Sequence, residues 1–144
     1  MNGRTAIVLL VAVFLVSGCE PEPMLVVRKN PSVPDVPVPS GFRFDPTDST
    51  DFTSETTNER YVNYHYTGRA LFADVVSFYK RYMPVEGWRL QQDVGTGGRQ
   101  TLHFKKSGVG PVTPETPTCI ITVFGSGEYA NAIRFQRMEK QGTP

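Results

Sequence analysis

Apolar and polar residues alternate along three stretches of the chain, at residues 61–67, 88–94 and 100–106. Because successive side chains of a strand point to opposite faces of a sheet, this alternation predicts three half-buried strands. Residues 95–98, which include three glycines, separate the second stretch from the third. A short glycine-rich break between alternating stretches is typical of a hairpin turn, so we expect these two strands to be antiparallel neighbours.

Two further strands are expected toward the C-terminus. Residues 119–124 (CIITVF) carry apolar side chains at both odd- and even-numbered positions, which point to opposite faces of a strand. This pattern is typical of a strand at the centre of a sheet. Residues 125–128 (GSGE) then predict a turn. The last strand is expected around residues 132–136, with Ile133 and Phe135 on one side.

The period changes between residues 70 and 83, where apolar residues recur at three- and four-residue spacing. This pattern predicts an amphipathic helix whose apolar stripe packs on a sheet. Pro84 and Gly87 follow the stretch, and both residue types are typical of a helix end. The stripe consists of Leu71, Phe72, Val75, Phe78, Tyr79 and Tyr82.

These elements predict an α+β fold of two layers, in which one amphipathic helix packs on a mostly antiparallel sheet of about five strands. Their order is one strand, the helix and then four strands. A right-handed crossover through the helix makes the first two strands parallel, and hairpins make the rest antiparallel. The expected globular domain spans residues 60–140.

Residues 19–59 are expected to precede this domain as a tether and a loop. Seven prolines fall between residues 20 and 46. Since proline fixes φ and lacks an N–H donor, this stretch predicts extended, polyproline-like chain. Residues 45–59 carry five acids, no base and many serines and threonines, which predicts a solvated loop.

The acidic loop raises a calcium hypothesis, because Asp45, Asp48 and Asp51 are regularly spaced and calcium is bound by several carboxylate oxygens. The chain lacks the turn glycine and the closing glutamate that an EF-hand loop needs at fixed offsets. We therefore expect no metal here.

The N-terminus has the pattern of an export signal. Arg4 precedes an apolar run at residues 6–16, which has the length of a secretory h-region and is too short to span a bilayer. Residues 16–19 (VSGC) resemble the lipobox of bacterial lipoproteins, which implies cleavage after Gly18 and lipid attachment to Cys19. The alternatives are an ordinary signal peptide in which the cysteine occurs by chance, and an uncleaved anchor.

Composition then limits the possible partners. The 15 basic and 14 acidic residues give a formal net charge of +1, which is too small to hold a nucleic acid through bulk charge. Removal of residues 1–18 takes away Arg4 and leaves 14 residues of each sign. Cys119 is then without an intramolecular partner, and we expect it to be a thiol in the core.

No catalytic constellation emerges from the candidate residues. Residues 125–130 (GSGEYA) match a dinucleotide-binding pattern, but 144 minus 130 leaves only 14 residues, too few for the helix and strand of such a site. His65, His103 and Cys119 are not expected to form a zinc site. Strand parity directs the two histidines away from the helix and the cysteine toward it, so the three side chains lie on opposite faces of the sheet. We expect no enzyme activity, no metal and no cofactor.

The sheet face opposite the helix is the candidate binding surface. Parity predicts a polar, mildly basic face with an apolar centre, which suits another envelope protein or an anionic glycan. The alternatives are that the tether or the loop at residues 108–117 covers it, or that two copies of the chain pair through it. Asn63, Gln91, Thr101 and Ile120 are expected on this face, and the expected partner-binding residues are His65, Arg89, His103, Lys105, Phe124 and Arg134.

Several short motifs resemble those of a family of small, uncharacterised bacterial envelope lipoproteins. They are YTG at 66–68, DVVSFY at 74–79, MPVEGW at 83–88, TLHFKK at 101–106 and CII at 119–121. In that family a proline-rich start precedes a strand, a helix containing FY, an MPxxGW turn and a hairpin. The resemblance covers residues 36–125, implies this fold and an envelope location, and brings no catalytic residues.

Together these features predict a lipid-anchored cell-envelope protein that presents a small α+β domain on a flexible tether and has a binding or structural role. The alternative is a small envelope enzyme or ligand carrier. An exposed apolar patch around Ile120 and Phe124 favours the first reading. A concave pocket lined by titratable groups with shifted pKa values favours the second.

Overall fold

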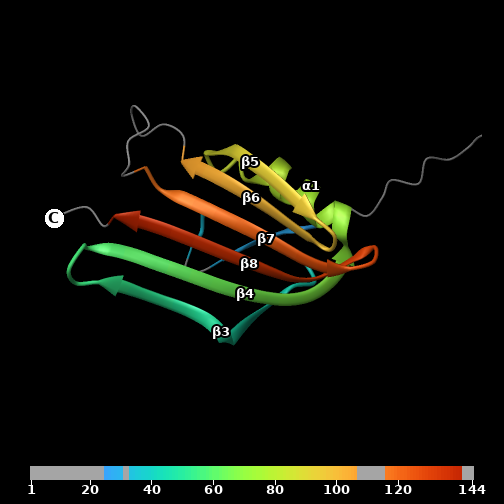
Figure 1. Ribbon diagram of the computed structural model, residues 1–144, viewed down its shortest axis with the longest axis horizontal. Coiled ribbons are helices and arrows are strands. Elements are labelled where there is room, and N and C mark those ends of the chain that lie inside the picture. Colours follow the sequence, from blue (N-terminus) through green and yellow to red (C-terminus); the bar gives the residue numbers. More distant parts are fainter. Residues whose placement is uncertain (1–24, 31–32, 107–115, 141–144) are drawn as a thin grey trace, which may run out of the picture.

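The structure, a computed structural model, describes residues 25–30, 33–106 and 116–140. One helix and a two-stranded hairpin cover one face of a six-stranded antiparallel sheet (Figure 1). The elements are β1 (Val27–Lys29), β2 (Pro37–Pro39), β3 (Arg43–Ser54), β4 (Glu59–Leu71), α1 (Phe72–Tyr82), β5 (Trp88–Thr96), β6 (Arg99–Lys106), β7 (Thr118–Ser126) and β8 (Tyr129–Lys140). The predicted α+β fold of two layers is confirmed.

The strand order in the large sheet is β3-β4-β8-β7-β6-β5, and every neighbouring pair is antiparallel. β4 and β5 therefore run in the same direction with three strands between them, and α1 connects them across the sheet (Figure 1). The predicted parallel orientation of these two strands is confirmed. β7 lies between β8 and β6, as its continuous apolar pattern indicates.

The helix and the turn between β5 and β6 follow local rules. α1 has Asp74 in its first turn and Lys80 and Arg81 in its last turn, which complements the helix dipole. β5 and β6 are joined by Gly97 and Gly98, and Gly98 has a φ of +81° that residues with a side chain rarely adopt.

The core lies between the sheet and the layer formed by α1 and the β1–β2 hairpin. The inward-facing residues alternate along the strands as the parity predicts, and none of them is more than 9% exposed. They are Val62, Tyr64, Tyr66, Leu102, Phe104, Cys119, Ile121, Val123, Ile133 and Phe135 from the sheet, and Val75, Val76, Phe78 and Tyr79 from α1.

Residues 33–42 of the proline-rich segment are packed into this core. Val33, Val36, Val38 and Phe42 are at most 6% exposed and belong to the same apolar cluster. The expectation of an extended, solvated tether is therefore wrong for residues 33–42. Polyproline and strand backbones have similar dihedral angles, so prolines are tolerated in the short β1–β2 pair while the intervening valines are buried.

The acidic stretch forms the edge strand β3, so the prediction of a solvated loop at residues 45–59 is wrong for residues 45–54. Nε and Nη2 of Arg60 on β4 donate to the two carboxylate oxygens of Asp51 at 3.0 and 2.6 Å. The Tyr64 hydroxyl donates to the same carboxylate at 2.6 Å. Most of β3 is exposed on both faces, so polar residues are tolerated and no alternation marks it as a strand. The sheet consequently has six strands rather than about five.

A register irregularity in β5 changes which residues face each side of the sheet. Leu90 and Gln92 pair with successive residues of β6, so Gln91 is an extra residue at this point. In β5 after Gln91, the even-numbered residues therefore face the side of the sheet that the odd-numbered residues face before it. Gln92 and Val94 lie on the face opposite α1, a placement that simple alternation from Trp88 did not predict.

Candidate functional site

The predicted cleavage site after Gly18 and the predicted lipid-attachment residue Cys19 lie outside the described residues. Within the described ranges, no helix has both the length and the apolar character needed to cross a membrane. The motif at residues 16–19 is the feature that predicts lipid attachment.

The structure brings the six predicted partner-binding residues to the sheet face opposite α1. They are His65 on β4, Arg134 on β8, Phe124 on β7, His103 and Lys105 on β6, and Arg89 on β5. The guanidinium carbons of Arg99 and Arg134 lie 5.4 and 5.9 Å from the centroid of the Phe124 ring. Phe124 is thus the centre of a small basic, aromatic cluster.

A shallow groove of about 320 Å³ lies on the same face, near the edge formed by β3. Phe52 stacks on Tyr61 with ring centroids 5.3 Å apart, and Met138 of β8 pairs with Tyr61 of β4 in the strand register. Phe52 is 56% exposed and Met138 is 44% exposed. The sequence pattern missed both residues because β3 was expected to be a loop and the last strand was expected to end near residue 136.

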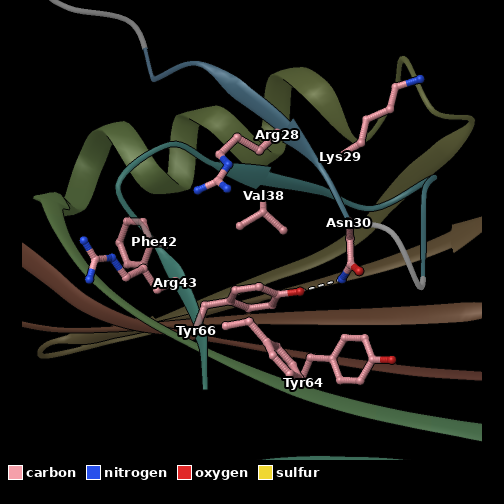
Figure 2. Close-up of a pocket in the computed structure, with 9 residues that line it drawn as sticks. Arg28, Lys29, Asn30, Val38, Phe42, Arg43, Tyr64 and Tyr66 are labelled. Carbon is pink, nitrogen blue, oxygen red and sulfur yellow. Dashed lines mark hydrogen bonds between the residues drawn. The ribbon is translucent and has the colours of Figure 1, made fainter. Parts of the chain in front are cut away.

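A second pocket, of about 390 Å³, lies between the β1–β2 hairpin and the helix-facing side of the sheet (Figure 2). Its lining residues are Arg28, Lys29, Asn30, Val38, Phe42, Arg43, Phe44, Tyr64 and Tyr66. Apolar and aromatic walls with a few polar groups are the usual composition of a small-molecule site. We regard this hairpin pocket as the candidate functional site.

Four aromatic rings form the floor of the hairpin pocket. The ring centroid of Phe44 lies 5.1 Å from that of Tyr64 and 5.7 Å from that of Tyr66, both in edge-to-face geometry. Tyr64 and Tyr66 are each 6% exposed, whereas Phe44 is 49% exposed. The fourth ring belongs to Phe42, which is buried. Phe44 therefore extends the aromatic surface outward to solvent.

Asn30 and Tyr66 form the polar end of the hairpin pocket. The side-chain amide of Asn30 donates to the Tyr66 hydroxyl, and Figure 2 shows this bond across the pocket. Burial, together with the neighbouring Tyr64, raises the pKa of Tyr66 to about 12, although the bond from Asn30 acts in the opposite direction. The Tyr66 phenol is therefore neutral at physiological pH and can donate its proton to an acceptor in the pocket.

In the part of the chain that the structure describes, three basic residues line the hairpin pocket and no acidic residue does. Within the described ranges, none of Arg28, Lys29 and Arg43 forms a salt bridge. In Figure 2, Arg28 and Arg43 lie on the same side of the pocket as Phe42, whereas the Lys29 side chain extends away from the other lining residues. Positive charge at the mouth thus adjoins the aromatic floor.

The sequence pattern missed this pocket because seven of its nine lining residues lie between residues 28 and 44. The proline content of that stretch predicts a tether rather than part of the folded domain. The sequence feature that indicates the pocket is the set of apolar residues at positions 33, 36, 38 and 42. Apolar side chains at these positions favour a buried segment over a solvated tether.

Cys119 lies apart from both histidines, as the parity predicts. Its side chain is fully buried on the helix-facing side, whereas His65 and His103 lie on the opposite face. Burial raises the pKa of the Cys119 thiol far above its ordinary value, despite the opposing effect of Arg137. A protonated, inaccessible thiol is neither a nucleophile nor a metal ligand.

No family model matches the chain, and no curated protein or solved structure shows a significant match to it. A function for this chain is therefore argued from its own residues and from the geometry described above.

Proposed function

We propose that this chain is a binding protein of the bacterial cell envelope whose hairpin pocket binds an amphipathic anion. The observation that carries the proposal is the lining of that pocket, which among the described residues combines three basic side chains and four aromatic rings with no acidic side chain. Attachment to a membrane through a lipid on Cys19 is the second part of the proposal, and the VSGC motif at residues 16–19 supports it.

Arg28 and Arg43 are the groups that would bind the anion. A guanidinium group binds a carboxylate, sulfonate or phosphate through paired, charge-assisted hydrogen bonds. Because neither residue is in a salt bridge within the described ranges, binding does not require an internal ion pair to break. Lys29 adds a third positive charge to the lining.

The aromatic floor would bind the apolar part of the ligand. Phe44 is half exposed, so a ligand that covers it removes apolar surface from water. A volume of about 390 Å³ suits a small molecule rather than a long polymer. The nine lining residues include no carboxylate, histidine or cysteine, which favours a carrier or sensor over an enzyme.

Two dyes with the same ring system test the pocket. The aryl sulfonate 8-anilino-1-naphthalenesulfonate carries an anion, and N-phenyl-1-naphthylamine is its uncharged analogue. We use the chain without residues 1–19, which keeps every described residue and the whole core. In the double variant Arg28→Ala, Arg43→Ala we expect the affinity for the sulfonate to fall by about tenfold or more, and that for the neutral dye by less than about threefold.

The matched control is the double variant Arg89→Ala, Arg99→Ala, which removes two arginines from β5 and β6, at the opposite edge of the sheet from β3. It should bind both dyes as the unmodified chain does. The pocket proposal is wrong if the two double variants weaken sulfonate binding equally. It is also wrong if Arg28→Ala, Arg43→Ala lowers the affinity for the sulfonate and for the neutral dye by the same factor. Far-UV circular dichroism verifies that each variant is folded.

The anchor is tested independently with Cys19→Ala in living bacteria. The unmodified chain should incorporate radiolabelled palmitate and fractionate with membranes, because two or three acyl chains are enough for stable attachment. Cys19→Ala should lose both properties. If the variant still incorporates palmitate and remains at the same membrane, the lipobox assignment is wrong.

A protein partner on the open sheet face is the second candidate function. The observation that favours it is the exposed apolar groove formed by Phe52, Tyr61 and Met138, which lies on the same sheet face as the basic, aromatic cluster around Phe124. Cross-linking in intact cells followed by mass spectrometry should recover an envelope protein whose capture is lost in Phe124→Ala. Capture that is unchanged in this variant contradicts this second function.

A further inference from the structure

We propose that Asp45, Asp48 and His65 form a binding site for a divalent transition-metal ion at the edge of the sheet. The two aspartates come from β3 and the histidine comes from β4. One ligand atom from each residue lies within 4.8 Å of the other two. The group is independent of the hairpin pocket, because it lies on the opposite face of the sheet.

A wide irregularity in β3 brings the two aspartates together. Asp45 pairs with His65 and the pairing resumes at Thr50, so residues 46–49 project from the ladder as a loop. The Ser49 hydroxyl closes this loop, since it accepts a hydrogen bond from the His65 backbone N–H at 2.9 Å and donates to the Asp45 carbonyl oxygen at 2.5 Å. The loop returns the chain so that the Asp48 carboxylate lies near Nδ1 of His65.

The distances suit a bound ion better than direct hydrogen bonds. Nδ1 of His65 lies 3.9 Å from Oδ2 of Asp45 and 3.7 Å from Oδ2 of Asp48. Ligand atoms bound at about 2.0–2.2 Å around a tetrahedral ion are about 3.3–3.6 Å apart. Asp48 is 61% exposed, so its side chain is free to make the small adjustment that coordination needs.

His65 provides the independent sign that a ligand belongs at this point. Its Nδ1 atom is buried and forms no hydrogen bond, although the His65 side chain as a whole is 14% exposed. A buried polar atom without a partner is uncommon in folded proteins and calls for an explanation. An ion placed between the three side chains would coordinate this nitrogen and neutralise both carboxylates.

One imidazole and two carboxylates select for a particular class of ion. Imidazole binds zinc and neighbouring first-row metals, whereas calcium and magnesium prefer oxygen ligands alone. Three protein ligands leave at least one position for water. Arg134 pairs with His65 in the strand register, but its guanidinium lies near the Phe124 ring rather than in the cluster.

The calcium hypothesis based on Asp45, Asp48 and Asp51 is replaced by this assignment. Asp51 follows the irregularity and faces the opposite side of the sheet, where Arg60 and Tyr64 bind its carboxylate. The remaining two aspartates meet His65 instead, which strand parity alone did not indicate. The bound ion would fasten the edge strand β3 to β4.

Titration calorimetry with Zn²⁺, on tag-free chain lacking residues 1–19, tests the site. We expect one Zn²⁺ ion per chain, with Ca²⁺ and Mg²⁺ bound at least tenfold more weakly. Asp48→Asn and His65→Asn should each weaken Zn²⁺ binding by at least tenfold. His103→Asn is the matched control, since it removes the other histidine of the same sheet face and should leave the affinity unchanged.

Histidine ¹⁵N spectra of the unmodified chain provide a readout that does not depend on the folding of any variant. Zn²⁺ should shift the Nδ1 resonance of His65 and leave that of His103 in place. Failure of Zn²⁺ to bind, or binding that depends on His103 instead, overturns the metal site.

Discussion

Asp35 and Arg137 lie 102 positions apart in the sequence and form a hydrogen-bonded ion pair, in which Nη1 of Arg137 donates to Oδ1 of Asp35 at 2.6 Å. Nζ of Lys106 donates to the other carboxylate oxygen at 2.5 Å, and the indole N–H of Trp88 donates to the Asp35 carbonyl oxygen at 2.9 Å. These bonds fasten the segment before β2 to β5, β6 and β8. The hairpin pocket depends on this attachment, because the hairpin forms one wall of it.

Replacement of Asp35 should therefore destabilise the whole domain. Asp35→Ala leaves the cations of Lys106 and Arg137, which are only 22% and 12% exposed, without their common acceptor. We expect a loss of about 2–3 kcal/mol in the free energy of unfolding, measured by urea denaturation. Glu55→Ala, in the exposed turn after β3, should change it by less than about 0.5 kcal/mol. Equal stability of the two variants contradicts a stabilising role for the ion pairs of Asp35 with Lys106 and Arg137.

The same ion pair makes stability depend on pH in the acid range. Burial raises the pKa of Asp35, but the hydrogen bond from Lys106 and the charge of Arg137 outweigh it, so the pKa lies below its ordinary value of 3.8. A lowered pKa in the folded state stabilises the protein above the unfolded-state pKa, and this contribution is lost as the pH falls through the folded-state pKa.

The stability difference between the unmodified chain and Asp35→Asn should accordingly be largest near neutral pH and shrink below about pH 3.8. Urea denaturation of both proteins at several pH values between about 7 and 2 measures it. A difference that stays constant over this range shows that the charge of Asp35 does not contribute.

Gly68 allows the turn after β2 to pack closely on β4. A Cβ atom at this position would lie 2.5 Å from the Gly41 carbonyl oxygen and 2.8 Å from Cγ of Phe42. Gly68→Ala should therefore displace Phe42 and lower the free energy of unfolding by about 1–3 kcal/mol. It should also weaken dye binding in the pocket that Phe42 lines.

Gly97→Ala is the matched control for this substitution, because a Cβ atom there meets nothing within 4 Å. We expect urea denaturation to give the same free energy of unfolding for Gly97→Ala and the unmodified chain within about 0.5 kcal/mol. Unchanged stability and dye binding in Gly68→Ala would show that the turn moves away without cost.

The Cys119 thiol should be inert in the folded protein. It is fully buried, and burial raises its pKa, so neither access nor the reactive thiolate form is available. In the chain without residues 1–19, Cys119 is the sole cysteine. Ellman's reagent should therefore detect close to no thiol in buffer and one thiol per chain in guanidinium chloride. Rapid reaction in buffer shows that the core opens locally.

Patterns within short stretches were sufficient for the strands that have one buried and one exposed face. Val62, Tyr64 and Tyr66 are buried and His65 is on the opposite face because the alternation of a strand is a local geometric property. The same reasoning placed Cys119 in the core. It failed beyond Leu90, because one extra residue in β5 reverses the parity and nothing local marks its position.

The segment at residues 33–54 depends on contacts with other parts of the chain. Prolines and acids there are compatible with a solvated chain, so local propensity favours a tether and a loop. The segment is ordered because Asp35 meets Lys106 and Arg137, and Asp51 meets Arg60 and Tyr64. The partners of Asp35 are 71 and 102 residues away, and no window of sequence contains them.

Sequence periodicity thus established the α+β fold, the helix between β4 and β5, and the six side chains that share the open sheet face. Those features follow from backbone geometry that repeats every two or 3.6 residues. The hairpin pocket and the Asp45, Asp48 and His65 cluster came from the folded chain alone. Each joins residues from different strands whose proximity is set by the packing of one element on another, which short-range pattern does not encode.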